Sequence, residues 1–324
     1  MKKALIVGSN GQDASYLAEY LLTLDYDIYG TIRRNSVPES QTTRIDQIHK
    51  NKQITLIYAD LLDRSSIDNA IKISQPDEIY HLAAQSHVRI SFDMPKYTTD
   101  VNCGGTINVL ESARDNCPEA KIYNAASSEM FGNSIDSDGY QRITTPMHPV
   151  SPYGCSKLFA FNICKNYRHA YNMFISSGIL FNHESPRRGI NFVTNKIVTS
   201  AVKIKNGNLD KLRLGNLQAY RDWGHAKDYV KAMHLMLQQN NPEDYIVATG
   251  KSYSVEFLLQ YVFDKLSLDI NKHVIIDKYY ERPEELEVLK GDASKIAKLG
   301  WNSQYDFFSM IDEMIEYAQY NTVC

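Results

Sequence analysis

The first fourteen residues constrain the fold more than any other part of the chain. A short apolar run, Lys3–Val7, ends at Gly8, and small residues recur at Gly11 and Ala14. An apolar run of this length predicts a buried strand, and the helical spacing of the apolar residues that follow predicts a helix. Small residues in such a turn let the backbone approach a pyrophosphate at the helix N-terminus. The segment therefore predicts a dinucleotide-binding turn that Gly8 and Gly11 would form.

Strand and helix patterns alternate through the first half of the chain. Short apolar runs predict further strands at residues 28–32, 54–58, 78–82, 121–125 and 174–180. The alternation predicts an α/β fold, a Rossmann-type doubly wound parallel sheet. Beyond Asn182 the pattern becomes irregular and polar. We expect a nucleotide-binding domain at residues 1–180, with returning elements from about 215–250, and a smaller, interleaved C-terminal substrate domain at residues 181–324.

Composition and charge exclude several functions. A hydrophobic content of 43% and a charged content of 23% are ordinary for a soluble globular protein. The net charge is −3 and no strong basic run occurs, so nucleic acid is not an expected partner. No apolar stretch approaches the roughly 18 residues of a membrane span. The five cysteines have no Cys-x-x-Cys spacing, so we expect reduced thiols, no metal site and a cytoplasmic protein.

The residues after the second expected strand bear on the choice of dinucleotide. An acidic residue there would bind the ribose 2′-hydroxyl of NAD, but this chain has Arg33 and Arg34. Guanidinium groups bind a 2′-phosphate in bidentate fashion, so the sequence predicts NADP. The alternative is that the arginines form a surface turn or a subunit contact. Further cofactor contacts are expected after the third and fourth strands, at Asp60, Leu61, Leu82, Ala83 and Ser86.

Tyr153 and Lys157 are four residues apart in a helical pattern and so lie on one helix face. A lysine ammonium beside a phenol favours the phenolate and lowers a pKa that is usually about 10. Such a tyrosine can take a proton from a sugar hydroxyl while hydride leaves the same carbon. The pair alone is more often an exposed helix face. Here it follows the nucleotide-binding half and a strand that ends at Ser127, whose hydroxyl can align the substrate.

Glu129 supplies a second base, which alcohol oxidation alone does not need. Once a C4 hydroxyl becomes a ketone, the C5 proton is acidic and Glu129 can remove it. C6 then loses its hydroxyl as water, with Ser128 assisting proton transfer, and hydride returns to C6. The sequence therefore predicts oxidation followed by elimination. An epimerase or C4 oxidase on the same fold would share Tyr153 and Lys157 without needing Glu129, and a non-enzymatic NADP sensor would need none of them.

Long segments carry a resemblance to a known family. They lie at residues 178–189, 215–230 and 282–285, with 85–93 adding to them. On these residues the chain resembles the GDP-mannose 4,6-dehydratases, extended short-chain dehydrogenase/reductases that act on nucleotide sugars. The resemblance runs from Lys3 to about Trp301 and implies a GDP-sugar 4,6-dehydratase that uses NADP. Family members form dimers and tetramers, so a homodimer or homotetramer is expected.

The resemblance implies a role for each matching position. Catalytic residues would be Ser127, Glu129, Tyr153 and Lys157. NADP contacts would be Gly8, Gly11, Gln12, Asp13, Arg33, Asp60, Leu61, Leu82, Ser86, Tyr97, His183 and Arg188. GDP-sugar contacts would be Ser86, Asn182, Lys196, Arg221, Arg282 and Glu285. Departures from the family pattern at Ala14, Ser127 and Asn195 leave GDP-mannose, GDP-manno-heptose and GDP-N-acetylglucosamine open as the sugar nucleotide.

Overall fold

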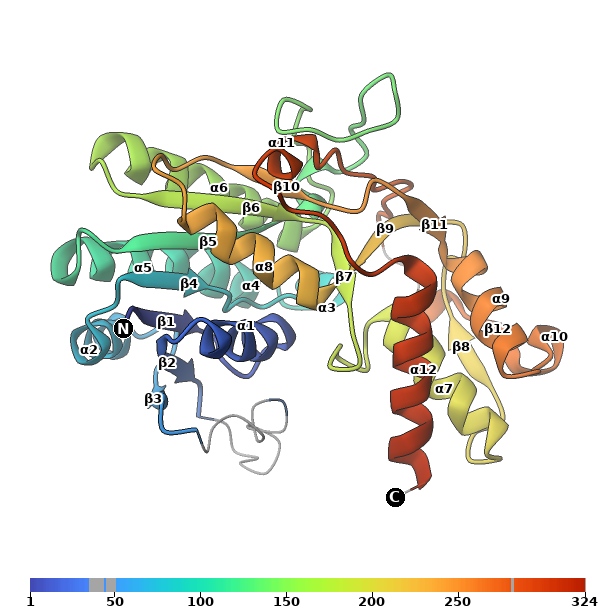
Figure 1. Ribbon diagram of the computed structural model, residues 1–324. Helices are drawn as coiled ribbons and strands as arrows, with labels where there is room; N and C mark the ends of the chain where they lie inside the picture. The colour runs from blue at the N-terminus through green and yellow to red at the C-terminus, as the bar shows by residue number, and fades with distance from the viewer. Residues whose placement is uncertain (35–43, 45–50, 281–282, 324) are drawn as a thin grey trace.

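A parallel sheet forms the centre of the protein (Figure 1). The structure is a computed structural model that describes residues 1–34, 44, 51–280 and 283–323. The strands of the sheet are β1 (Lys3–Val7), β2 (Asp27–Ile32), β3 (Ile54–Tyr58), β4 (Glu78–His81), β5 (Lys121–Ser127), β6 (Ile175–Leu180) and β10 (Tyr245–Val247). Their order is β10-β6-β5-β4-β1-β2-β3, with parallel pairing between neighbours. The predicted doubly wound Rossmann-type sheet is confirmed.

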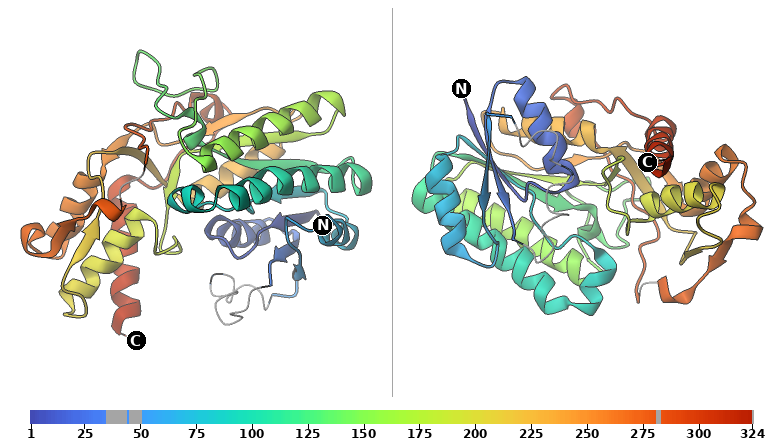
Figure 2. Two further views of the ribbon diagram at one scale, coloured as in Figure 1. Left: turned by 180° about the vertical axis from the view of Figure 1, so that it is seen from behind. Right: turned by 90° about the horizontal axis from the view of Figure 1, so that it is seen from below.

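Helices cover both faces of this sheet (Figures 1 and 2). On one face lie α1 (Gln12–Thr23) and α8 (Ala226–Leu237), and on the other lie α2 (Arg64–Ser74), α5 (Gly105–Asn116) and α6 (Pro152–Ala170). Alternate residues of β1 point to opposite faces of the sheet. Ala4 and Ile6 pack with α1 and α8 on one face, while Leu5 and Val7 pack with α2 and α5 on the other. Because both faces are buried, exposed polar residues do not alternate with apolar ones along these strands, and polar side chains such as those of Glu78, Asn124 and Ser177 are themselves buried. This is why short apolar runs predicted the strands.

A second hydrophobic core lies beside the carboxyl edge of the sheet (Figure 1). It is built from α7 (Val193–Lys205), α9 (Val255–Lys265), α12 (Phe307–Val323), β8 (Leu212–Leu214) and β12 (Val274–Ile276). Between the two cores, β9 (Tyr220–His225) pairs with β7 (Asn182–Glu184) and with β11 (Ser252–Ser254). The chain crosses between the cores repeatedly, because β9 leads directly into α8 and then β10 of the large sheet.

Short helices connect the larger elements near the carboxyl edge. They are α3 (Val88–Asp93), α4 (Pro95–Thr99), the π-helix η2 (Asp100–Gly104) and the 3₁₀-helix η3 (Ser128–Phe131). Farther along the chain lie α10 (Ile270–His273), η4 (Lys278–Tyr280) and α11 (Ser294–Ala297). Helix α6 begins where local signals place it: the Ser151 side chain accepts the N–H of Gly154 at 3.0 Å, and Pro152 occupies the first turn. This start sets the position of Tyr153.

Candidate active site

The predicted site residues gather at the carboxyl edge of the large sheet. Val7 pairs with His81, and His81 pairs with Asn124, so the ends of β1, β4 and β5 lie side by side. The Gly-rich turn follows β1, the Leu82 loop follows β4, and Ser127 ends β5. The strand order reverses between β1 and β4, which is where open α/β sheets bind their ligands.

The first turn is shaped for close approach of a ligand to the backbone. Gly8 has a φ of +95°, and a Cβ there would come within 2.8 Å of the Cα of Ala83. A side chain at this position would therefore be strained and would clash with the loop after β4. The Gly11 N–H donates to the Gly8 oxygen at 3.2 Å, and α1 begins at the next residue. The helix N-terminus thus opens onto the site, as a diphosphate requires.

Arg33 and Tyr97 meet at the end of β2. The Arg33 Nη1 donates to the Tyr97 hydroxyl at 2.5 Å, and both Arg33 and Arg34 are exposed. Sequence reasoning named all three residues as cofactor contacts. The structure brings Arg33 and Tyr97 together at the place where a doubly wound fold holds the adenosine ribose.

The other expected cofactor positions are tied into the surrounding loops. The Asp60 Oδ1 accepts the N–H of Leu62 at 3.0 Å, and the Leu61 oxygen accepts the Asn108 amide at 2.7 Å. The Leu82 N–H donates to the Val7 oxygen at 3.1 Å, which extends the β1–β4 pairing by one residue. These bonds fix the loops that line the carboxyl edge.

The catalytic candidates form one buried cluster. Ser127, Ser128, Glu129, Tyr153 and Lys157 are each at most 9% exposed. The Ser127 hydroxyl accepts the N–H of Glu129 at 3.2 Å and so starts η3, and it lies near enough to the Tyr153 phenol to lower the pKa of that phenol. Ser127 and Tyr153, which are 26 positions apart in the sequence, are thereby brought together where α6 packs against β5 and η3.

Lys157 points from α6 toward the end of β5. Its Nζ donates to the Ala125 oxygen at 2.9 Å and lies 5.9 Å from the centre of the Tyr153 ring. Burial lowers the pKa of Lys157 to about 8. The ammonium form therefore still predominates at neutral pH in the protein alone, and it is lost as pH rises through about 8.

The expected lowering of the Tyr153 pKa is wrong for the protein alone. Burial raises the pKa of Tyr153 to about 12; the Ser127 hydrogen bond works against this rise, and the Glu129 carboxylate adds to it. A buried phenolate is costly, and the Lys157 ammonium is engaged with a backbone oxygen instead of the phenol. The sequence shows the Tyr-Lys spacing but not this burial.

Four of the expected substrate residues come from β7, α7, β9 and the segment 283–292. They are Asn182, Lys196, Arg221 and Glu285. Arg221 of β9 is buried and pairs with Glu285, with Nη2 to Oε1 at 2.8 Å, and its Nη1 donates to the Leu286 oxygen at 2.9 Å. The Lys196 Nζ lies 3.4 Å from the centre of the Tyr280 ring.

Asn182 and the two remaining substrate candidates have different surroundings. Among the described residues, the buried Asn182 Oδ1 of β7 has no hydrogen-bond partner, as expected of a group that receives a ligand. Ser86 is exposed on the loop after β4. Arg282 lies outside the described residues.

Sequence reasoning missed residues that hold the start of α6, the helix that carries Tyr153 and Lys157, in place. The Tyr153 N–H donates to the Ser91 hydroxyl at 3.2 Å. Asn102, within the π-helix η2, donates to the Ser156 hydroxyl at 2.9 Å and pairs with the backbone of Gln85. Ordinary polar residues in helical segments carry no sequence signal for such a role, although π-helical turns are frequent at functional sites once the structure is known.

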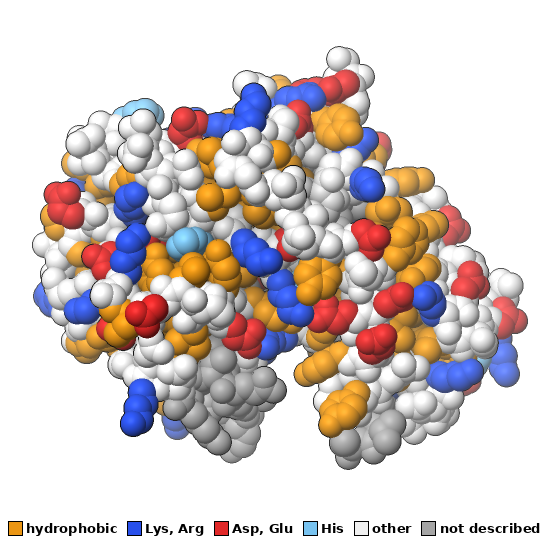
Figure 3. All heavy atoms as spheres, in the orientation of Figure 1, with side chains coloured by type: hydrophobic (Ala, Val, Ile, Leu, Met, Phe, Trp, Pro, Cys, Tyr) orange, Lys and Arg blue, Asp and Glu red, His pale blue; other side chains and the backbone are white. Residues whose placement is uncertain are grey.

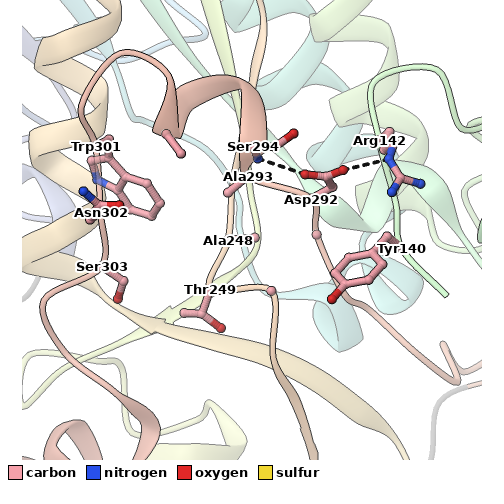
Figure 4. A pocket seen from close by; sticks show the side chains of 13 residues that line it. Tyr140, Arg142, Ala248, Thr249, Asp292, Ala293, Ser294, Trp301, Asn302 and Ser303 are labelled. Atoms are coloured by element: carbon pink, nitrogen blue, oxygen red, sulfur yellow. Dashed lines mark hydrogen bonds and ion pairs between the residues drawn. The ribbon is translucent and has the colours of Figure 1, made fainter. Parts of the chain in front are cut away.

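A separate pocket lies away from this cluster, between α11 and the loop that carries Tyr140 (Figure 4). Its volume is about 350 Å³, and Tyr140, Arg142, Asp292 and Trp301 are among its lining residues. The guanidinium of Arg142 pairs with Asp292 at 2.7 Å and with two more carboxylates, so its charge is already balanced. We therefore place the candidate active site at the Ser127–Tyr153 cluster and not in this pocket.

Three features are absent from the face shown in Figure 3 or from the described residues. On the face shown in Figure 3, basic and acidic side chains are interspersed without an extended basic patch. Within residues 1–34, 44, 51–280 and 283–323, we find no cluster of metal-ligating side chains. No helix in that part of the chain has the length and apolar character needed to span a bilayer.

The fold and the site define the class of protein. Solved structures with the same fold include a dTDP-glucose 4,6-dehydratase from Streptomyces venezuelae with NAD bound (22% identity, TM-score 0.86, 99% of this chain and 98% of that one). Another is RMD from Pseudomonas aeruginosa in complex with NADPH (18% identity, TM-score 0.80, 99% and 100%). This chain therefore has the Rossmann-type fold of the extended short-chain dehydratases and epimerases.

Sequence comparison places it within that class. The family model for GDP-mannose 4,6 dehydratase matches residues 5–314, and the chain belongs to this family. GDP-mannose 4,6 dehydratase 2 of Arabidopsis thaliana is 49% identical over 97% of this chain and 86% of its own length. The GDP-mannose 4,6 dehydratase of Homo sapiens is 44% identical over 96% and 90%.

Proposed function

We propose that this protein is an NADP-dependent GDP-mannose 4,6-dehydratase. One observation carries the chemistry: the Glu129 carboxylate and the Ser127–Tyr153 pair share one buried cluster at the ligand-binding edge of the sheet. Oxidation at C4 alone would need only Ser127 and Tyr153, and not Glu129. Membership of the GDP-mannose 4,6 dehydratase family supports the same reaction.

The residues of the first turn fit a dinucleotide. Gly8 leaves a cradle that a Cβ would fill, and the N-terminus of α1 supplies unpaired N–H groups for a diphosphate. Arg33, held by Tyr97, is positioned for a 2′-phosphate, which favours NADP over NAD. When bound, the nicotinamide supplies a hydride acceptor for C4 and a hydride donor for C6.

Tyr153 acts as the base in the oxidation half. The Ser127 hydroxyl holds both the substrate hydroxyl and the phenol, so the proton at the C4 oxygen passes to the Tyr153 oxygen. Since burial raises the pKa of Tyr153 to about 12, the phenolate needs positive charge nearby. Lys157, on the same helix face, supplies part of that charge when it is protonated.

Glu129 acts in the elimination half. The 4-keto group makes the C5 proton acidic, and the Glu129 carboxylate removes it. The C6 hydroxyl leaves as water with a proton from Glu129 or Ser128. Both residues are buried, so bulk water does not compete for these protons.

The sugar nucleotide would lie across the gap between the two cores. Asn182, Lys196, Arg221 and Glu285 would bind it, because a diphosphate needs cations and charge-assisted bonds. We retain the division into a nucleotide-binding unit at 1–180, with returning elements, and a mainly substrate-binding unit at 181–324. We also propose a homodimer or homotetramer in the cytoplasm.

Mass spectrometry of the purified protein tests the function. The protein is incubated in parallel with GDP-mannose, GDP-manno-heptose and GDP-N-acetylglucosamine, with no cofactor added. We expect GDP-mannose to lose the mass of one water, which would also show that a nicotinamide cofactor is carried bound; the mass of the dinucleotide released on denaturation would identify it as NADP. Loss of water only from another sugar nucleotide would change the substrate, and an oxidised or isobaric product would favour a C4 oxidase or an epimerase.

A further inference from the structure

His183 is held in a way that fixes its protonation state. It lies in β7, and its Nδ1 is 2.8 Å from the Phe181 backbone oxygen while its Nε2 is 2.8 Å from the Oδ2 of Asp13. A carbonyl oxygen and a carboxylate oxygen only accept hydrogen bonds. Both ring nitrogens must therefore donate, which requires the doubly protonated imidazolium.

The groups around the ring support a charged state. Asp13, in the first turn of α1, faces Nε2, and the Tyr229 ring of α8 stacks on the imidazole at 4.6 Å between centres. Two arginines are also within electrostatic reach of the pair: Arg188 acts on both His183 and Asp13, and Arg44 acts on Asp13. Gln12 ties the pair together, since its amide donates to the Asp13 Oδ1 at 3.0 Å and to the His183 oxygen at 3.2 Å.

The pKa values of the pair move in opposite directions. Burial by itself would lower the pKa of His183, but the attraction of Asp13 outweighs burial and raises the pKa above its usual 6.5. Burial by itself would raise the pKa of Asp13, but His183 lowers it below 3.8. The ion pair therefore exists at least from pH 3.8 to 6.5, and it is lost as pH rises through the raised pKa of His183.

The position of Asp13 gives this pair a consequence for ligand binding. An aspartate in the first turn of α1 puts a negative charge at the helix end where a dinucleotide diphosphate would bind. We propose that His183 is a fixed cation that neutralises Asp13, so that the N-terminus of α1 can accept the diphosphate of the dinucleotide. This inference rests on the proposed binding of NADP. It extends to catalysis, because Asp13 also acts on the Tyr153 phenol and raises its pKa.

A double-mutant cycle separates charge compensation from a structural role. We would measure NADP⁺ binding calorimetrically for the wild type, His183→Gln, Asp13→Asn and the double variant, near pH 6, where the ion pair is formed. His183→Gln should weaken binding roughly tenfold while Asp13 is present, and no more than about twofold in the Asp13→Asn background. An equal loss in both backgrounds would overturn the proposal, because a purely structural histidine does not depend on the charge of Asp13.

Two readouts keep the test decisive if His183→Gln folds poorly. Raising the pH from about 6 to about 9 should weaken NADP⁺ binding to the wild type more than to Asp13→Asn, and equal pH dependence would contradict the proposal. The ¹³C shift of the His183 ring near pH 6, assigned by comparison with the variant, should be that of an imidazolium; a neutral ring would overturn it. Wild-type protein that fails to bind NADP⁺ at any pH would instead refute the proposed cofactor, and the ring shift would still decide the charge of His183.

Discussion

The backbone oxygen of Glu129 lies against the α-carbon of Gly154, so close that a Cβ at position 154 would come within 2.8 Å of it. The same Cβ would meet Pro149 at 2.9 Å. This contact joins the loop that carries one catalytic candidate to the helix turn that carries another, Tyr153. The glycine therefore sets how closely α6 approaches the end of β5, and with it the spacing of the two proposed bases, Tyr153 and Glu129.

Gly154→Ala should impair both stability and turnover. The Cβ meets backbone on one side and a proline on the other, so neither neighbour can yield cheaply. We expect a loss of about 1–3 kcal/mol in the free energy of unfolding, the usual cost of overpacking. Because α6 must shift, GDP-mannose turnover should fall by about tenfold or more. Chemical denaturation and steady-state kinetics would measure the two effects.

Gly104 provides the matched control. It also has helical backbone angles, but a Cβ there meets nothing within 4 Å. Gly104→Ala should therefore keep activity and leave stability unchanged or raise it by up to about 1 kcal/mol. Equal losses in the two variants would mean that the Gly154–Glu129 contact has no special importance.

Glu129→Gln should separate the two halves of the reaction. The amide fills the same space but cannot remove the C5 proton, so loss of water should fall by a factor of about 100 or more. Oxidation at C4 should persist, because Ser127 and Tyr153 are unchanged. Trapping the 4-keto sugar nucleotide by borohydride reduction, followed by mass spectrometry, would measure both. If the variant folds and binds both ligands but oxidises no better than it dehydrates, the assignment of Glu129 to elimination fails.

Lys157→Met should stabilise the protein while it abolishes activity. Burial lowers the pKa of Lys157 from 10.5 to about 8, so its charge costs the folded state about 3 kcal/mol near pH 7. The variant also loses the hydrogen bond to the Ala125 oxygen, which lowers its free energy of unfolding by about 1 kcal/mol. The net gain should be about 2 kcal/mol and should shrink as pH rises from about 8 to 10.5, where the wild type gains stability by releasing the proton.

Denaturation at about pH 7 and pH 10 would test this dependence. Lys165→Met is the control on the same helix, since Lys165 is only partly buried, and it should give no pH-dependent gain. A Lys157→Met variant that is less stable than wild type at pH 7 would show that the lysine contributes more through its bonds than burial costs it.

The sequence predicted those features that depend on local pattern. The apolar runs predicted the strands because both faces of the sheet are covered, and Gly8 was identified because small residues in such a turn let the backbone approach a pyrophosphate. The positive φ of Gly8 was visible only in the structure. The resemblance to the family supplied Asp13 and His183, but not that they form an ion pair, since they are 170 residues apart and meet only when β7 returns to α1.

Properties that depend on tertiary burial could not be predicted. The Tyr153 pKa was expected to fall because the Tyr-Lys spacing was visible, whereas the burial that raises it was not. Ser91 and Asn102 hold the start of α6, yet they are ordinary polar residues in helical segments. Their importance arises from which elements pack against α6, and the chain order alone does not reveal that.

The contact between Arg33 and Tyr97 leads to the last prediction. The Tyr97 hydroxyl accepts the Arg33 Nη1 at 2.5 Å and so orients an exposed guanidinium that would otherwise move freely. Tyr97→Phe should therefore weaken NADP⁺ binding by about threefold to tenfold, the value of one hydrogen bond, and leave NAD⁺ binding unchanged. Arg33→Asp should weaken NADP⁺ binding far more and relatively favour NAD⁺, because a carboxylate repels the 2′-phosphate.

Calorimetric titration with each dinucleotide would measure these ratios. Tyr320→Phe, at an exposed tyrosine of α12, is the control for loss of a phenolic hydroxyl and should change neither affinity. If Tyr97→Phe weakens both dinucleotides equally, then Tyr97 supports the loop and not the guanidinium. If Arg33→Asp leaves the preference between NADP⁺ and NAD⁺ unchanged, the 2′-phosphate is bound elsewhere, and Arg34 becomes the residue to substitute, since it is the next cation along the same loop.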